Sequence, residues 1–102
     1  MPLTNLTAEQ EDAICKLLKD LPSNINKPNQ INMAVVSHYL TALRSLDYLN
    51  DTNLYNLYTW VGKITGKEMP SYSHFNEAYP SDTVRKVEKA KDKILAVLQK
   101  IR

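Results

Sequence analysis

Hydrophobic positions recur with the spacing of an α-helix along residues 28–49, the stretch PNQINMAVVSHYLTALRSLDYL. On a helix of about 3.6 residues per turn, one stripe of this stretch collects apolar side chains, namely Ile31, Val35, Tyr39, Ala42, Leu46 and Leu49. No formally charged side chain lies between Lys27 and Arg44, although 24% of the chain is charged. Because such a helix can bury most of its circumference, we predict that this uncharged helix lies at the centre of the fold.

Helical periodicity extends to three further stretches, residues 7–21, 52–65 and 82–101. Thr7 and Gln10 have the spacing of a capping box, which would start the first of these helices. Gly66 is suited to end the second, because glycine readily adopts the left-handed conformation of a helix C-cap. The connections between the four helices are short. We therefore predict an all-α, single-domain protein, an antiparallel bundle of about four helices around the central helix 28–49.

The segment 67–80, KEMPSYSHFNEAYP, has no clear hydrophobic period. A short helix over residues 71–78 is compatible with Pro70, which can precede a first helical turn, and with Pro80, which cannot continue one. An irregular loop is compatible with the same residues. The sequence leaves these two alternatives open.

Composition and charge bear on the environment of the protein more than on its activity. The chain has 102 residues, a net charge of +2 and a single cysteine, Cys15, which cannot form an internal disulfide. The N-terminal residues lack the basic start and apolar core of a signal peptide. No run of residues approaches the roughly 18 apolar residues of a spanning helix. These features favour a cytoplasmic protein without membrane insertion, and they do not indicate an oligomeric state.

Residues that could carry catalysis or bind a metal are few and scattered. His38 and His74 lie far apart in the sequence, and neither has a cysteine or carboxylate at ligand spacing. We interpret His38 as a hydrogen-bonded residue at the edge of the core. Cys15 has no histidine near it in the sequence that would favour a nucleophilic pair. The segment 62–67, which holds both glycines, does not have the spacing of a phosphate-binding loop. The sequence therefore predicts no catalytic residue, metal or cofactor, and we expect a protein that is not an enzyme.

Aromatic residues are concentrated in one part of the chain, since seven of the eight lie between Tyr48 and Tyr79. Some of these rings can simply close the core. Tyr55 and Trp60, however, lie outside the apolar stripe of the helix 52–65, and tyrosine and tryptophan are enriched at the energetic centres of protein interfaces. We therefore predict that the protein is an adaptor, regulator or inhibitor that binds another protein through a surface comprising Tyr55, Trp60, Tyr72, His74 and Tyr79.

A nucleic-acid-binding module is the alternative prediction. The segment 58–79 could form a helix-turn-helix, and the helix 82–101 has a basic face consisting of Arg85, Lys86, Lys89, Lys93 and Lys100. Against this, the turn from Gly66 to Pro70 is long, and the expected recognition helix contains no arginine. A lysine-rich helix face can also simply be solvated. Lys91, within the apolar arc of the same helix, is expected either to extend toward solvent or to pair with Glu11.

Overall fold

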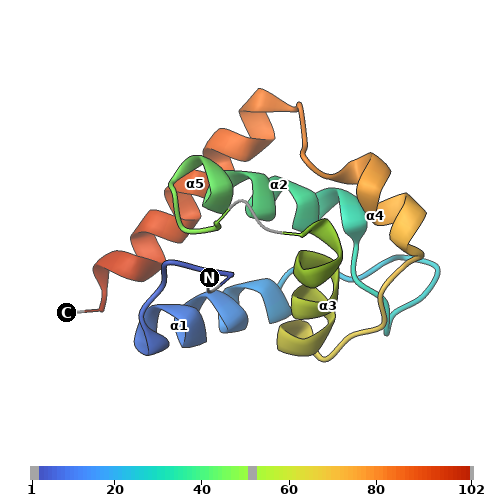
Figure 1. Cartoon of the computed structure of the whole chain (residues 1–102), viewed down its shortest axis with the longest axis horizontal. Helices are drawn as coiled ribbons and strands as arrows, with labels where there is room; N and C mark the ends of the chain where they lie inside the picture. Colours follow the sequence, from blue (N-terminus) through green and yellow to red (C-terminus); the bar gives the residue numbers. More distant parts are fainter. Residues whose placement is uncertain (1–2, 51–52, 102) are drawn as a thin grey trace.

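Helices make up most of the chain in the computed structural model, which describes residues 3–50 and 53–101. This part of the chain contains five helices and no extended strand (Figure 1), so the all-α prediction is confirmed. The helices are α1 (Ala8–Lys19), α2 (Met33–Ser45), α3 (Leu54–Thr65), α4 (Tyr72–Ala78) and α5 (Val84–Gln99). They form one compact globule with a Cα radius of gyration of 12.7 Å.

Several helix ends follow directly from the residues beside them. The capping box predicted for α1 is present, because the Gln10 N–H donates to the Thr7 hydroxyl over 3.2 Å and the Thr7 N–H donates to the Gln10 side chain over 2.9 Å. Helix α3 ends at Gly66, whose φ of 63° is the left-handed conformation expected there. The N-cap of α3 is Asn53, while Thr52, the start expected from the sequence, lies outside the described residues.

The central helix is shorter than the hydrophobic pattern predicted. Helix α2 begins at Met33 rather than at Pro28, because the Asn32 side chain caps the helix by accepting from the Val35 N–H. The residues before Asn32 pair with a distant loop instead, where the Ile31 N–H donates to the Glu68 carbonyl over 3.2 Å. The first residue of the apolar stripe, Ile31, thus lies before the helix but is still buried.

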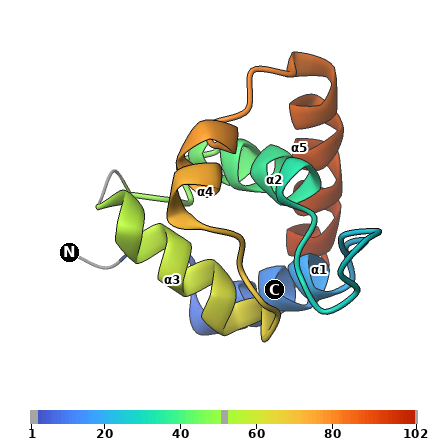
Figure 2. The same ribbon diagram turned by 90° about the vertical axis from the view of Figure 1, so that its right-hand side faces the viewer.

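The described helices do not run side by side along a common axis. The backbone of α5 approaches α2 most extensively and also approaches α1, while α3 lies against α1 and α4. In Figures 1 and 2, α5 crosses α1 and α2 obliquely, so the regular antiparallel bundle expected from the sequence is not confirmed. The largest fully buried side chains come from all five helices, and they are Phe75, Ile14, Leu18, Leu40, Leu43, Ile94, Val36 and Val61.

The small polar residues of α2 anchor the chain that leads into α5. The Thr41 hydroxyl donates to the Ser37 carbonyl over 2.7 Å and accepts from the Ser81 N–H over 2.8 Å. This bond ties the connection between α4 and α5 to the middle of α2. It therefore helps to position α5, which begins at Val84 rather than at residue 82.

One ion pair between described residues lies on α5. Lys91 pairs with Glu88 over 3.1 Å, and not with Glu11, which was the predicted alternative to extension toward solvent. A carboxylate one turn away on the same helix is reached at lower entropic cost than one on another helix. None of the helices in the described ranges is long and apolar enough to cross a membrane.

Candidate functional site

Five aromatic rings from α3 and α4 contact one another in a continuous series, which we call the aromatic cluster: Tyr55, Tyr58, Tyr72, Phe75 and Tyr79. The rings of Tyr55, Tyr58 and Tyr72 form a triangle with centroid separations of 5.4–5.9 Å. Tyr58 also contacts Phe75 edge-to-face at 5.3 Å, and Phe75 stacks on Tyr79. These separations are typical of favourable ring pairs.

The cluster extends from the hydrophobic core to the surface. Phe75 is completely buried and Tyr79 is 7% exposed, whereas Tyr72 is 38% and Tyr55 is 52% exposed. Tyr58, between these extremes, donates a hydrogen bond from its hydroxyl to the Pro70 carbonyl. The two exposed rings therefore share a contact with Tyr58, which packs against the core.

Helix α4 is stabilised at its N-terminus by a side-chain cap. The Ser71 side chain accepts from the His74 N–H over 3.3 Å and so caps the helix. Tyr72 and Phe75 are three positions apart and lie on the side of α4 that faces α3, where Tyr55 and Tyr58 have the same spacing. The short helix over residues 71–78, which the sequence left open, thus brings two pairs of rings together.

The five aromatic and histidine positions expected at the surface are not equivalent in the structure. Tyr55 and Tyr72 are exposed and in contact, and His74 is exposed on α4. Trp60 is half-buried and packs against the hydrophobic core, and Tyr79 is buried. Tyr58 and Phe75 were not among the site residues predicted from the sequence, yet Tyr58 contacts both exposed rings and Phe75 contacts Tyr58. The matching spacing of three on both helices was the signal for this arrangement.

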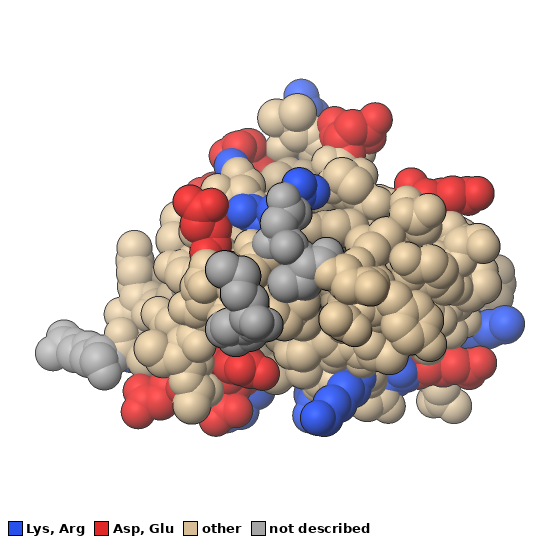
Figure 3. Space-filling model, in the orientation of Figure 1, with Lys and Arg blue, Asp and Glu red and all other residues tan. Residues whose placement is uncertain are grey.

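The surface around the exposed tyrosines carries little charge. Between Asn53 and Pro80 the charged side chains are Lys63, Lys67, Glu68 and Glu77. Figure 3 shows one face of the molecule, on which the region over α3 and α4 is mostly uncharged and the acidic and basic side chains lie around its margin. A partner that docks here would have few ions to desolvate.

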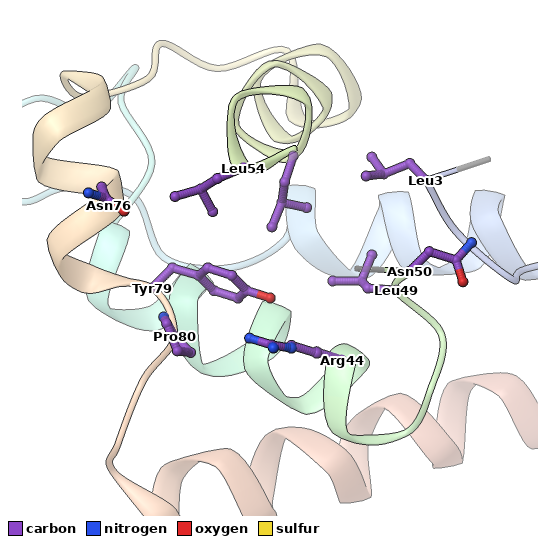
Figure 4. Close-up of a pocket in the computed structure, with 9 residues that line it drawn as sticks. Leu3, Arg44, Leu49, Asn50, Leu54, Asn76, Tyr79 and Pro80 are labelled. Carbon is purple, nitrogen blue, oxygen red and sulfur yellow. The ribbon is translucent and has the colours of Figure 1, made fainter. Parts of the chain in front are cut away.

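A cavity of about 180 Å³ lies behind the cluster, between α2, α3 and α4 (Figure 4). Arg44 of α2 and Tyr79 at the end of α4 point toward it, opposite Leu54 of α3. Its other walls are largely apolar and include Leu49 and Leu57. The volume is below the roughly 300–1,000 Å³ of ordinary small-molecule sites, so this cavity could enclose only a small chemical group.

A second hollow, of about 230 Å³, lies between α2 and α5, and we call it the basic groove. It is lined by Val35, His38, Tyr39, Lys86, Lys89, Ala90 and Lys93. No acidic residue lines it, and within the described chain none of the three lysines forms an ion pair. Arg85 and Lys100, the other two members of the predicted basic face, are exposed on α5 outside the groove.

His38 differs from its expected role. It is half-buried at the edge of the groove, but its imidazole forms no hydrogen bond to any residue that the structure describes. Burial and the nearby Lys86 ammonium together hold the pKa of His38 below its usual value. The imidazole is therefore largely neutral at physiological pH and adds a polar but uncharged group to the basic groove.

The helix-turn-helix interpretation is not supported by a shared surface. Helix α4, YSHFNEA, has seven residues and contains no lysine or arginine. The basic groove is lined only by residues of α2 and α5. The proposed recognition helix and the cluster of lysines thus belong to different sites.

Potential metal ligands are not clustered in the described residues. No cluster of three or more His, Cys, Asp or Glu residues there could hold a metal ion. Burial, followed by the charges of Glu11 and Asp12, raises the pKa of the Cys15 thiol, so it stays protonated at neutral pH and is a poor nucleophile.

Comparisons with protein-family models, curated proteins and solved structures give no match for this chain. Its function must therefore be argued from its own residues and their geometry.

Proposed function

We propose that this protein acts without catalysis, as an adaptor, regulator or inhibitor that binds another protein. The binding surface is the one around the exposed rings of Tyr55 and Tyr72, which we call the α3–α4 face. The observation that carries this proposal is the pair of exposed tyrosine rings, Tyr55 and Tyr72, in contact with each other and with Tyr58. Large exposed apolar groups usually occur singly, whereas a group that is contiguous and supported from below offers a partner a continuous contact area.

The geometry favours binding for a physical reason. A side chain that is already held in one position loses little conformational entropy when a partner covers it, so more of the contact energy appears as affinity. Tyr58 contacts both outer rings and is itself in contact with the buried Phe75, so it restricts the outer rings in this way. Tyrosine also combines a large apolar ring with a hydroxyl that can hydrogen bond at the rim of an interface.

The proposal can be tested by affinity capture from source cells with three versions of the protein. The double variant Tyr55→Ser and Tyr72→Ser should lose the partner captured by the unmodified protein. The matched control is Ile25→Ser and Val84→Ser, which removes two apolar residues that are 93% and 70% exposed and belong to neither α3 nor α4. This control should retain the partner. Titration of the purified partner should then show the same difference in Kd.

Folding must be monitored in the same experiment. Removing the two outer rings breaks edge contacts worth about 0.5–1.5 kcal/mol each, so the variant is expected to melt at a lower temperature but remain folded at the temperature of the assay. Circular dichroism checks this. Equal capture by the tyrosine variant and the control variant, with both folded, would show that the α3–α4 face is not the binding surface.

Nucleic-acid binding through α5 is the second candidate, and it is supported by the three lysines that lack carboxylate partners in the described chain. It predicts salt-dependent retention on duplex DNA, with a shallower salt dependence after Lys89→Ala and Lys93→Ala. No retention at low salt would remove this candidate.

A further inference from the structure

We infer that the basic groove between α2 and α5 binds a small ligand that carries phosphate groups. This site is separate from the α3–α4 face and does not depend on the protein-binding proposal. Its lining contains three ammonium groups, an imidazole and a phenol, together with the apolar side chains of Val35 and Ala90. The polar groups are mainly hydrogen-bond donors, and no carboxylate is present to hold a cation.

The lysines have a spacing that suits a ligand with several negative charges. Lys86, Lys89 and Lys93 are three and four positions apart, so they lie in one row on α5. At about 1.5 Å of rise per residue, this row is roughly 10 Å long. A single carboxylate could compensate only one of the ammonium groups, whereas a phosphate group offers several acceptor oxygens and up to about two charges.

The two acidic residues of α5 form no ion pair with the lysine row among the described residues. Glu88 forms its ion pair with Lys91, on the other side of the helix from the groove. Asp92 is exposed and forms no ion pair among the described residues. The three like charges therefore repel one another in the unliganded protein, and an anion in the groove would relieve this repulsion.

Tyr39 provides an independent indication that the groove is a binding site. Its side chain is only 7% exposed, yet its hydroxyl forms no hydrogen bond within the described residues. No fully buried side-chain oxygen or nitrogen there lacks a partner, so the Tyr39 hydroxyl must be accessible to solvent. The groove is the hollow that Tyr39 lines. A nearly buried phenol with an unused donor, in the lining of the same groove as three lysines, is well placed to hydrogen bond a phosphate oxygen.

The dimensions favour a small molecule over nucleic acid. A hollow of about 230 Å³ that includes the nearly buried Tyr39 can surround a phosphate group. A duplex backbone, in contrast, would lie along the outside of α5 and would also engage Arg85 and Lys100, which are outside the groove.

The test is a titration of the isotopically labelled protein with inorganic pyrophosphate, followed by NMR at neutral pH and with ionic strength held constant by sodium chloride. Saturable shifts are expected for amides of α2 and α5 around His38 and Lys89. The variant Lys86→Gln with Lys89→Gln should bind at least about tenfold more weakly, since each charge-assisted hydrogen bond contributes appreciably to affinity. Tyr39→Phe, which keeps the ring and all charges, should also bind more weakly.

The matched control is Lys27→Gln with Lys63→Gln, which removes two exposed charges that do not line the groove. It should bind pyrophosphate as the unmodified protein does. Equal weakening in both double variants would show that binding depends only on the net charge of the protein, which would overturn the proposal. Chemical shifts that do not saturate with pyrophosphate would also overturn it. A short DNA duplex is titrated in parallel. If the duplex saturates the same amides and pyrophosphate does not, the groove is a nucleic-acid contact and the small-ligand proposal is wrong.

Discussion

The aromatic cluster and the basic groove are both open to solvent, but they relate to the stability of the fold in opposite ways. Each ring of the cluster contacts at least one other, and the series ends in the core at Phe75 and Tyr79. The lysines of the groove have no such support, because Lys86, Lys89 and Lys93 place like charges beside one another without a counter-ion in the described chain. The cluster therefore contributes to folding, while the groove opposes it.

This difference in stability bears on how strongly each region indicates a binding function. The packing of the cluster can be explained by stability alone, so its case for function rests on the two exposed rings. A concentration of like charge is not explained by stability, since neighbouring like charges on a helix destabilise it. The contrast predicts that substitutions in the two regions will change the free energy of unfolding with opposite signs.

The largest expected effect comes from the inner end of the cluster. Phe75→Ala removes a ring that is 0% exposed and should lower the free energy of unfolding by about 3–5 kcal/mol, through lost burial and the cavity left behind. Chemical denaturation followed by tryptophan fluorescence and circular dichroism measures this change. If the Ala variant does not fold, Phe75→Leu provides a milder version of the same test.

Tyr72→Ala is the comparison variant for this prediction. Its ring is 38% exposed and contacts Tyr55 and Tyr58, so the loss should be smaller, about 1–2 kcal/mol. Similar losses for the two variants would contradict the gradient from core to surface on which our description of the cluster depends.

Much of the local structure could be predicted from the sequence because it depends on neighbours along the chain. The capping box of Thr7 and Gln10 and the C-cap at Gly66 were recognisable from residue types and spacing. The start of α2 was not, since both Pro28 and Asn32 suit a helix N-terminus. The pairing of Ile31 with Glu68 settles this choice, and it joins segments that are far apart in the sequence.

The candidate sites were harder to predict because each combines two helices. Periodicity showed that Tyr55 lies off the core stripe, but it could not show that the ring of Tyr72 contacts the ring of Tyr55. Trp60, at the edge of its stripe, is half-buried against the core, because a residue at such an edge can be covered in part by a neighbouring element. The lysines of α5 were visible as a basic face, whereas the contribution of His38 and Tyr39 depends on how α2 packs against α5.

Removing charge from the basic groove should have a smaller effect, of the opposite sign. Lys89 is one turn from the like charges of Arg85, Lys86 and Lys93 and from the opposite charge of Asp92. Lys89→Gln therefore relieves three like-charge pairs and removes one opposite-charge pair, a net relief of two. We expect the free energy of unfolding to rise by a few tenths of a kcal/mol, roughly 0.2–0.5 per pair, at low salt and to return to the original value at high salt. Lys27→Gln, outside the groove, is the control and should change little. A loss of stability in Lys89→Gln would mean that its side chain makes a favourable packing contact that outweighs the repulsion.

The smallest effect is the pH dependence of the groove, which depends on His38. In the folded protein, burial and then Lys86 lower the pKa of His38 below the ordinary histidine value of 6.5. The unfolded chain has the ordinary pKa, so it binds a proton at a higher pH than the folded protein does. Stability should therefore decline as the pH falls below about 6.5, and this contribution should level off below the pKa of the folded protein. Lys86→Gln should raise the pKa of His38 and flatten the decline, while Lys89 and Lys93 remain in place. The imidazole resonances of His38, followed by NMR across this pH range, measure the change directly.

The control is Arg85→Gln, which removes a neighbouring charge outside the groove and should move the His38 pKa less. Equal effects of the two substitutions would show that His38 senses the overall charge of α5 and not a local contact with Lys86.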